Sequence, residues 1–298
     1  LAAVGNIVPF SKPERLFTLA IGPEFNRQVL GNPDLFRPSG PPRRWGSGRD
    51  DSALHRLSYG LTRMAGPKHQ QQRRLIMPPF QKKAVDGYCH TIASVMNQHL
   101  DDWGTRHTVD MWPQIQALSM SISSQTLFDL ENPKAAYALG QMIQDWLTLN
   151  YSTGVLMFPV DAPYTPYRRL LKHAERLERE ILRTIEKKRT GAAGGHDVLS
   201  LLARSRDETN CQMTEAELVG QATILFGASY ESLSSALAWT LFLLAQHPGI
   251  MADLLDELHG MLHGGPPTSE QLDELPQLEA AIKESLRLLP PFPFTVRR

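Results

Sequence analysis

The residues of this chain that could do chemistry are few, and the first group surrounds a single acid. Gly227-Ala228-Ser229-Tyr230-Glu231-Ser232 places that acid beside an alcohol, just after three small residues. Small side chains let another molecule approach the backbone closely, and an acid next to a hydroxyl can hold water at a break in the helix and relay protons. The stretch therefore predicts a proton-transfer site at Glu231 and Ser232. The alternative is structural: a small-residue packing patch with a paired, buried Glu231.

A second group combines a histidine with arginines. His69 and Arg73 lie four residues apart in Gly66-Pro67-Lys68-His69-Gln70-Gln71-Gln72-Arg73-Arg74, so they share one face of a helix. Together they could clamp a bound carboxylate or phosphate. The alternative is a solvated basic start of a helix.

The third group lies near the end of the sequence. Glu284 and Arg287 are three residues apart, which allows an ion pair on one helical face. Most such pairs are solvated and contribute little to stability. Here apolar residues surround the pair and Pro290-Pro291 ends the helix abruptly, so we expect Arg287 to brace the fold through a bidentate contact.

Helices must position these residues. The first sixty or so residues are rich in turn formers, with a short β segment expected near 16–21. Beyond Pro67 the pattern is overwhelmingly helical. The helices that we predict span His69–Met77, Lys82–Trp103, Met111–Asp129, Lys134–Leu149, Tyr164–Thr190, Thr214–Gln246, Gly249–Leu262 and Leu278–Leu289.

The longest predicted helix carries the acid in its middle. Thr214 and Glu217 form a capping-box pattern that starts it, and Pro248 marks its end. A membrane span is rejected, because Glu231 interrupts the apolar run before it reaches roughly eighteen charge-free residues. We therefore expect a central helix buried by others on nearly all sides, with Glu231 neutralised, hydrogen-bonded or facing a wet cavity.

Composition narrows the class of protein. The chain is 42% hydrophobic and 21% charged, which is ordinary for a globular domain, and 31 basic residues balance 31 acidic ones. That balance gives no electrostatic reason to expect nucleic acid or an anionic membrane as a partner. Two cysteines, Cys89 and Cys211, cannot make a disulfide framework or a zinc site, which favours a reducing, cytoplasmic location.

No repeat or linker divides the sequence, so we predict one domain over residues 1–298. It is expected to be mainly α with a small β component, β-rich over about 1–65 and helical over about 66–298.

Taken in order, the three groups resemble the cytochrome P-450 superfamily, in the form of its soluble bacterial members. His69-x-x-x-Arg73-Arg74, followed by Met77-Pro78-Pro79-Phe80, is similar to the family's C helix. Ala228-Ser229-Tyr230-Glu231-Ser232 is similar to the I-helix motif (Ala/Gly)-Gly-x-(Asp/Glu)-Thr. Glu284-x-x-Arg287 is similar to the K-helix motif.

Two further segments fit the same order. Pro163-Tyr164-Thr165-Pro166-Tyr167-Arg168 is similar to the start of the G helix, and His247-Pro248 to the junction of the I and J helices. The resemblance covers essentially the whole chain and implies a P-450-like helical domain truncated at both ends.

The resemblance implies a haem b cofactor. Its propionates would be bound by His69, Arg73 and Arg297, or by Arg298 if the register differs by one. Ala228 and Ser229 would lie against the haem face where oxygen binds.

The same resemblance implies the remaining roles. Glu231 and Ser232 would deliver protons for cleavage of the O–O bond. Glu284 and Arg287 would form a buried brace of the haem-side core, a structural rather than catalytic role.

The sequence departs from the family pattern in three ways. Ser229 replaces the usual Gly, and Ser232 replaces the usual Thr, losing the methyl group that fixes the rotamer. The Phe-x-x-Gly-x-Arg-x-Cys loop, which supplies the thiolate that ligates iron, would lie beyond Arg298. Neither Cys89 nor Cys211 lies in such a glycine-bracketed loop, so the chain as given is expected to lack the thiolate and the chemistry that depends on it.

The predicted function is a monooxygenase that inserts one oxygen atom from O2 into a lipophilic substrate such as a fatty acid, terpenoid or polyketide. Electrons would come ultimately from NAD(P)H through a separate ferredoxin or flavoprotein reductase, since no flavin or nucleotide motif occurs here. The substrate pocket is expected between the loop from about Gly40 to Thr62, the region Leu147–Tyr167, and the long helix near Phe226 and Tyr230.

The alternative is a helical haem- or ligand-binding protein without catalysis. The Ser229 and Ser232 replacements and the absent cysteine loop favour it.

Overall fold

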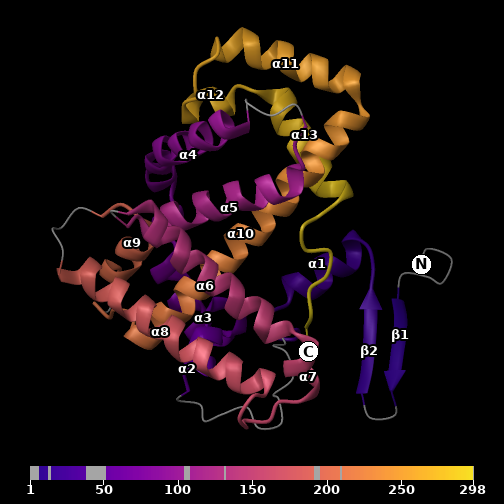
Figure 1. The fold of residues 1–298 in the computed structure, drawn as a ribbon. Helices are drawn as coiled ribbons and strands as arrows, with labels where there is room; N and C mark the ends of the chain where they lie inside the picture. The colour runs from indigo at the N-terminus through magenta and orange to yellow at the C-terminus, as the bar shows by residue number, and fades with distance from the viewer. Residues whose placement is uncertain are drawn as a thin grey trace.

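The computed structural model of the chain describes residues 7–12, 15–37, 52–103, 108–130, 132–190, 195–208 and 210–297. These residues form a mainly helical body with one β-hairpin at its side (Figure 1). The α-helices are α1 (Pro23–Gly31), α2 (Ala53–Ser58), α3 (Gly66–Ile76), α4 (Lys82–Trp103), α5 (Met111–Phe128), α6 (Pro133–Tyr151), α7 (Thr153–Met157), α8 (Pro166–Thr190), α9 (Val198–Arg204), α10 (Glu215–Gln246), α11 (Pro248–Leu262), α12 (Ser269–Asp273) and α13 (Pro276–Leu288).

The hairpin pairs strand β1 (Ile7–Lys12) with strand β2 (Arg15–Ala20) in antiparallel register, Ile7 opposite Ala20. The β segment predicted near 16–21 is therefore confirmed. The described part of the first 65 residues is mixed rather than β-rich, because α1, α2 and the single-turn 3-10 helix η2 (Leu61–Arg63) also lie there.

The start of α10 follows from local sequence chemistry. The hydroxyl of Thr214 accepts from the backbone N–H of Glu217 at 3.2 Å, and the Glu217 carboxylate accepts from the N–H of Thr214 at 2.9 Å. Both exposed donors at the helix start are thus satisfied, and the predicted capping box is confirmed.

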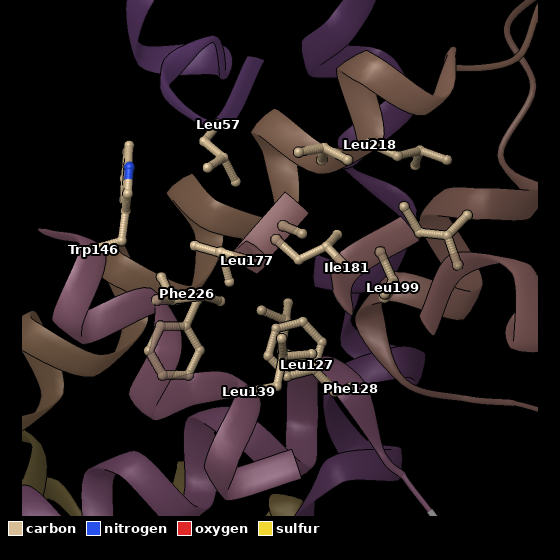
Figure 2. Close-up of a cluster of buried hydrophobic side chains, with 14 of the residues drawn as sticks. Leu57, Leu127, Phe128, Leu139, Trp146, Leu177, Ile181, Leu199, Leu218 and Phe226 are labelled. Carbon is tan, nitrogen blue, oxygen red and sulfur yellow. The ribbon is translucent and has the colours of Figure 1, made fainter. Parts of the chain in front are cut away.

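The core is built around the first half of α10 (Figure 2). Phe226 is fully buried and stacks between Phe128 of α5 and Tyr230, with ring centroids 6.0 Å apart on each side. Around these rings pack α5, α6, α8 and α9, whose buried aliphatic side chains include Leu127, Leu139, Leu177, Ile181 and Leu199. Each such side chain stabilises the fold by about 1.5–3 kcal/mol through burial.

The second half of α10 does not match the prediction of a helix buried on nearly all sides. From Ala228 onward only Tyr230, Ser234 and Leu244 are buried, and Trp239 and Phe242 are exposed. The reason is that α5, α6 and α2 surround the first half, whereas α11 and α13 lie against the second half and cover it only in part (Figure 1).

Helix α3 is fixed to α10 by two contacts one turn apart. Lys68 forms an ion pair with Glu217, and Gln221 donates its amide N–H to the Gln72 side chain at 3.2 Å in the buried interior. The same Gln221 accepts from the backbone N–H of Leu61 at 3.0 Å. These contacts hold α3 and η2 against one face of α10.

A close crossing of backbones completes this arrangement. A Cβ atom added to Gly220 would lie 2.2 Å from the carbonyl oxygen of Tyr59, and one added to Gly60 would lie 2.4 Å from Cγ1 of Ile224. Only residues without a side chain allow the segment after α2 to lie this near to α10.

The Lys68–Glu217 pair predicts a pH dependence of stability. Burial alone would raise the pKa of the Glu217 carboxyl, but hydrogen bonds with Lys68 and Thr214 and the Lys68 charge outweigh it and lower the pKa. Because the pKa of Glu217 is lower in the folded state than in the unfolded state, its carboxylate stabilises the fold at pH values above the ordinary pKa of 4.5. This stabilisation is lost as the pH falls through the folded-state pKa. Glu217→Gln, which can keep the cap, should therefore cost about 0.5–1 kcal/mol at neutral pH and less in acid.

Urea unfolding of wild type and Glu217→Gln at neutral pH and near pH 3.5 checks this. A difference in free energy of unfolding that stays the same at both pH values would contradict it.

Candidate functional site

A cavity of about 520 Å³ lies between α6, α10, the segment from α2 to α3, and the end of the chain. Such a volume is typical of small-molecule sites. Its lining combines apolar side chains with polar and charged ones: Ser58, Leu61, Thr62, Arg63, His69, Trp146, Leu147, Asn150, Tyr151, Ile224, Phe294, Thr295, Val296 and Arg297. In Figure 1 the last segment runs from α13 down to the end of α6 and α7.

Two basic side chains predicted to bind an anion meet in this cavity. His69 of α3 and Arg297 near the chain end both line it, although they are far apart in sequence. The Arg297 guanidinium donates to two neutral acceptors, the Thr295 hydroxyl at 2.7 Å and the Val296 carbonyl at 3.0 Å. Within the described residues no carboxylate forms an ion pair with it, so it can take an anionic partner.

The donor set suits a flat apolar group that carries carboxylates. Leu61, Leu147, Ile224, Phe294 and Val296 offer the apolar walls, and His69 and Arg297 offer donors for negative charge. A porphyrin with two propionates has this combination of properties, so the residues present fit a haem.

The predicted acid lies on a stripe that continues from the cavity. Ile224 lines the cavity, and Ala228 and Glu231 follow it at spacings of four and three, which keeps them on one face of α10. Ala228, Ser229 and Glu231 are all exposed. The expectation that Glu231 lies in the interior of a buried helix is therefore wrong for this chain, because the described residues cover that face of α10 only in part.

The environment of Glu231 still changes its acidity. Partial withdrawal from water raises the pKa of its carboxyl above the ordinary value. A carboxyl with a raised pKa keeps its proton to higher pH, which suits a group that delivers protons.

The two serines of the motif bond to the helix itself. The Ser232 hydroxyl donates to the carbonyl of Ala228, and the Ser229 hydroxyl donates to that of Phe226 at 3.0 Å. Helix α10 runs without interruption from Glu215 to Gln246, so the break that would hold a water beside Glu231 is not present. Neither serine lines the cavity.

The other predicted site residues lie outside the cavity. Arg73 is exposed one turn after His69 and does not contribute to the lining. Glu284 and Arg287 form the predicted bidentate pair, at 2.7 and 2.6 Å, but their side chains are 55% and 66% exposed. The prediction of a buried brace is wrong here, because no described segment covers this face of α13.

Some residues of the segments predicted to form the substrate pocket line this cavity. Ser58, Leu61 and Thr62 line the cavity, as do Leu147 and Tyr151, while positions 38–51 lie outside the described residues. Phe226 and Tyr230 belong instead to the core stack.

Sequence reasoning missed two contributions to the lining. The segment Phe294–Val296 was not expected to reach the cavity, and Trp146 was not singled out. The spacing of Trp146 and Asn150 could have indicated the tryptophan, because residues four apart lie one turn apart on the same face of α6, and both line the cavity.

Comparison with known proteins gives a consistent result. The family described as cytochrome P450 matches residues 5–298. The chain is 29% identical to the cyclooctat-9-en-7-ol 5-monooxygenase of Streptomyces melanosporofaciens over 94% of this chain and 60% of that protein. It is 25% identical to the pentalenene oxygenase of Streptomyces avermitilis over 98% of this chain and 64% of that protein. The chain thus spans less than two thirds of the length of these relatives.

Among solved structures, the retinoic acid-bound cyanobacterial CYP120A1 superposes with a TM-score of 0.80 at 22% identity, covering 99% of this chain and 64% of that one. This likeness shows a shared fold and confirms the predicted mainly helical class. Among the described residues, no helix combines the length and the apolar character that crossing a bilayer requires. With a family match over nearly its whole length, the chain belongs to the cytochrome P450 family.

Proposed function

We propose that this chain is part of a haem-dependent monooxygenase that inserts one oxygen atom from O2 into a lipophilic substrate. The observation that carries the proposal is that His69 and Arg297 line one cavity beside α10. Family membership supports haem as the cofactor. Electrons would come from a separate ferredoxin or flavoprotein, ultimately from NAD(P)H.

The chain's own groups have distinct tasks in this proposal. His69 and Arg297 would hold the haem propionates from the cavity wall, and Arg73, exposed one turn after His69 on α3, would add a third contact from outside the lining. Ala228 and Ser229 offer a small-residue surface against the ring. Haem, when bound, supplies the activation of oxygen and the oxidising power.

Proton delivery would fall to Glu231 and Ser232. Glu231 lies seven residues after the cavity residue Ile224 on the same helix face, and its raised pKa keeps the carboxyl protonated to higher pH. A carboxylic acid at the rim of a cavity can pass a proton inward through water and be reprotonated from solvent. Glu284 and Arg287, paired on an exposed face of α13, would take no part in the chemistry.

The substrate class follows from the lining and the relatives. Leu61, Leu147, Ile224, Phe294 and Val296 supply the apolar part of the wall. Two relatives are named for the oxygenation of a cyclic alkenol and of an alkene, cyclooctat-9-en-7-ol and pentalenene. Of the three lipophilic classes considered, fatty acid, terpenoid and polyketide, these names favour a terpenoid.

A second function is a haem- or ligand-binding protein without catalysis. It is favoured by the position of the described cysteines, since Cys89 lies in α4, Cys211 is exposed, and neither lines the cavity. The coding sequence that follows Arg298 separates the two functions. An in-frame cysteine loop there supports the monooxygenase, whereas a stop codon directly after Arg298 supports the binding protein.

Haem titration followed by Soret absorbance tests the site. His69→Ala and Arg297→Ala should each weaken haem binding by about ten- to a hundredfold, because a hydrogen bond to a charged group contributes about 1.5–3 kcal/mol. Arg74→Ala is the matched control: this arginine is adjacent to Arg73, is exposed and lies 3.9 Å from Glu208. Wild-type affinity in both His69→Ala and Arg297→Ala would contradict the proposed site.

A further inference from the structure

One buried side chain holds both ends of a segment that lines the cavity. The side-chain oxygen of Gln221 accepts from the backbone N–H of Leu61 at 3.0 Å, and its amide nitrogen donates to the side-chain oxygen of Gln72 at 3.2 Å. The two contacts therefore anchor the first and the last residue of segment 61–72. This segment contributes four residues to the cavity lining: Leu61, Thr62, Arg63 and His69.

Gln221 is itself removed from water and from the cavity. Its exposed fraction is 0% and that of Gln72 is 1%, and neither side chain lines the cavity. Burying an amide costs free energy unless its polar atoms are hydrogen-bonded, so this position meets a need that space filling alone does not create. A hydrogen bond constrains distance and direction, whereas apolar contact is non-directional. The amide is therefore suited to set the path of segment 61–72.

The partners of Gln221 also explain why the residue is a glutamine. The Leu61 N–H can only donate, so it must face an acceptor, and the amide nitrogen then faces Gln72 as a donor. A glutamine side chain presents one acceptor and one donor without a charge. An ionised glutamate lacks the donor, and a methionine lacks it too.

Helix α10 also contacts the cavity directly. Ile224, three residues after Gln221 on α10, lines the cavity. Gly60, directly before Leu61, lies so near α10 that a Cβ atom added to it would be 2.9 Å from the carbonyl oxygen of Gly220. Helix α10 thus supplies Ile224 to the lining and holds segment 61–72 through Gln221.

We infer that Gln221 is a positioning residue for cofactor binding: by anchoring segment 61–72 at both ends, it holds the His69 imidazole where that group can reach a haem propionate. The inference rests on the proposed function, in which His69 takes this carboxylate. Because Gln221 does not line the cavity, its effect on haem affinity must pass through segment 61–72.

A double-mutant cycle of Gln221→Met and His69→Ala tests this inference, with haem affinity measured by Soret titration rather than by turnover. Methionine is also unbranched and nearly as long as glutamine, but it cannot donate to Gln72. Gln221→Met should weaken haem binding by about three- to tenfold, the range expected from one net hydrogen bond. In the His69→Ala background the factor should be smaller by at least about twofold, as for residues that interact. Equal factors in both backgrounds overturn the inference.

Thr223→Val is the matched control. Thr223 is 1% exposed on the same helix, its hydroxyl donates to the Val219 carbonyl at 2.9 Å, and it does not line the cavity. The variant removes a buried hydrogen bond of α10 and leaves both contacts of Gln221 in place, so it should bind haem as wild type does. If it weakens binding as much as Gln221→Met, general loss of stability is the cause and the inference is overturned.

Wild type alone gives a second measurement, which decides the question if Gln221→Met does not fold. Coupling between two sites is reciprocal, so haem binding must favour the state in which the contacts of Gln221 are formed. The side-chain NH2 of Gln221, followed by NMR-detected hydrogen exchange, should exchange more slowly in the haem-loaded protein. Its slowing should exceed that of the Ser200 backbone N–H, which is bonded to Asp197 at the start of α9, outside the cavity. Equal slowing at both groups, or none at Gln221, overturns the inference.

Failure of this inference can be told apart from failure of the proposed function. If His69→Ala weakens haem binding and Gln221→Met does not, only the inference fails. If neither His69→Ala nor Arg297→Ala weakens it, the proposed haem site fails and the inference falls with it.

Discussion

Replacing Gly220 with alanine is expected to lower the free energy of unfolding by about 3 kcal/mol and to disturb the cavity. The added Cβ would lie 2.2 Å from the carbonyl oxygen of Tyr59 and 2.8 Å from its carbonyl carbon. Both are backbone atoms, so no side chain can rotate away, and the segment after α2 must move off α10. That movement would also break the hydrogen bond from the Leu61 N–H to Gln221.

Gly87→Ala is the matched control. Gly87 also lies inside a helix, α4, but a Cβ added there meets nothing within 4 Å. Alanine at this position should raise stability by about 0.5–1 kcal/mol, the ordinary gain from glycine to alanine in a helix. Urea unfolding followed by circular dichroism measures both variants, and hydrogen exchange at Leu61 reports the loss of the contact. Equal stability of Gly220→Ala and wild type would show that the backbone at Tyr59 lies farther from Gly220 than the structure places it.

Phe226→Ala should cost about 3–5 kcal/mol, the range for removing a fully buried aromatic ring. Phe226 lies between Phe128 and Tyr230 in the centre of the core, and the lost ring would leave a cavity that helices on several sides would have to fill. Gly140 could not move in freely, because its backbone already approaches both Phe226 and Ser124.

Phe242→Ala on the same helix is the comparison. Phe242 is 51% exposed and has an edge-to-face contact with Trp239. Its removal should change the free energy of unfolding by less than about 1 kcal/mol. Similar costs for the two variants, measured by urea unfolding, would mean that the two halves of α10 do not differ in packing as the structure shows.

Local patterns in the sequence were sufficient to predict the longer helices. The capping box of Thr214 and Glu217 determines where α10 begins, and the apolar periodicity predicted Lys82–Trp103 with the bounds that α4 has. Helices such as α2 and α9 were missed because six or seven residues are too few for a periodic pattern to stand out.

Burial could not be predicted in the same way, because it depends on which segments pack together. Glu231 and the Glu284–Arg287 pair have apolar neighbours in sequence, yet they lie on faces that the described residues leave open. The cavity could not be predicted from the sequence either, since α3, α6, α10 and the chain end each supply only a few of its residues. Family resemblance supplied His69 and Arg297, whereas the two contacts of the buried Gln221 amide become visible only in three dimensions.

The two contacts between α3 and α10 fix how far one helix is shifted along the other. Lys68 meets Glu217 and Gln72 meets Gln221, with the same four-residue step on each helix. A shift of α3 by one turn would place Gln72 opposite Glu217. The Lys68 ammonium and the buried Gln221 amide would then each lose their partner. Only one register of the two helices satisfies all of these groups. The distance between the imidazole of His69 and the α10 side of the cavity is therefore fixed by that register and cannot vary continuously.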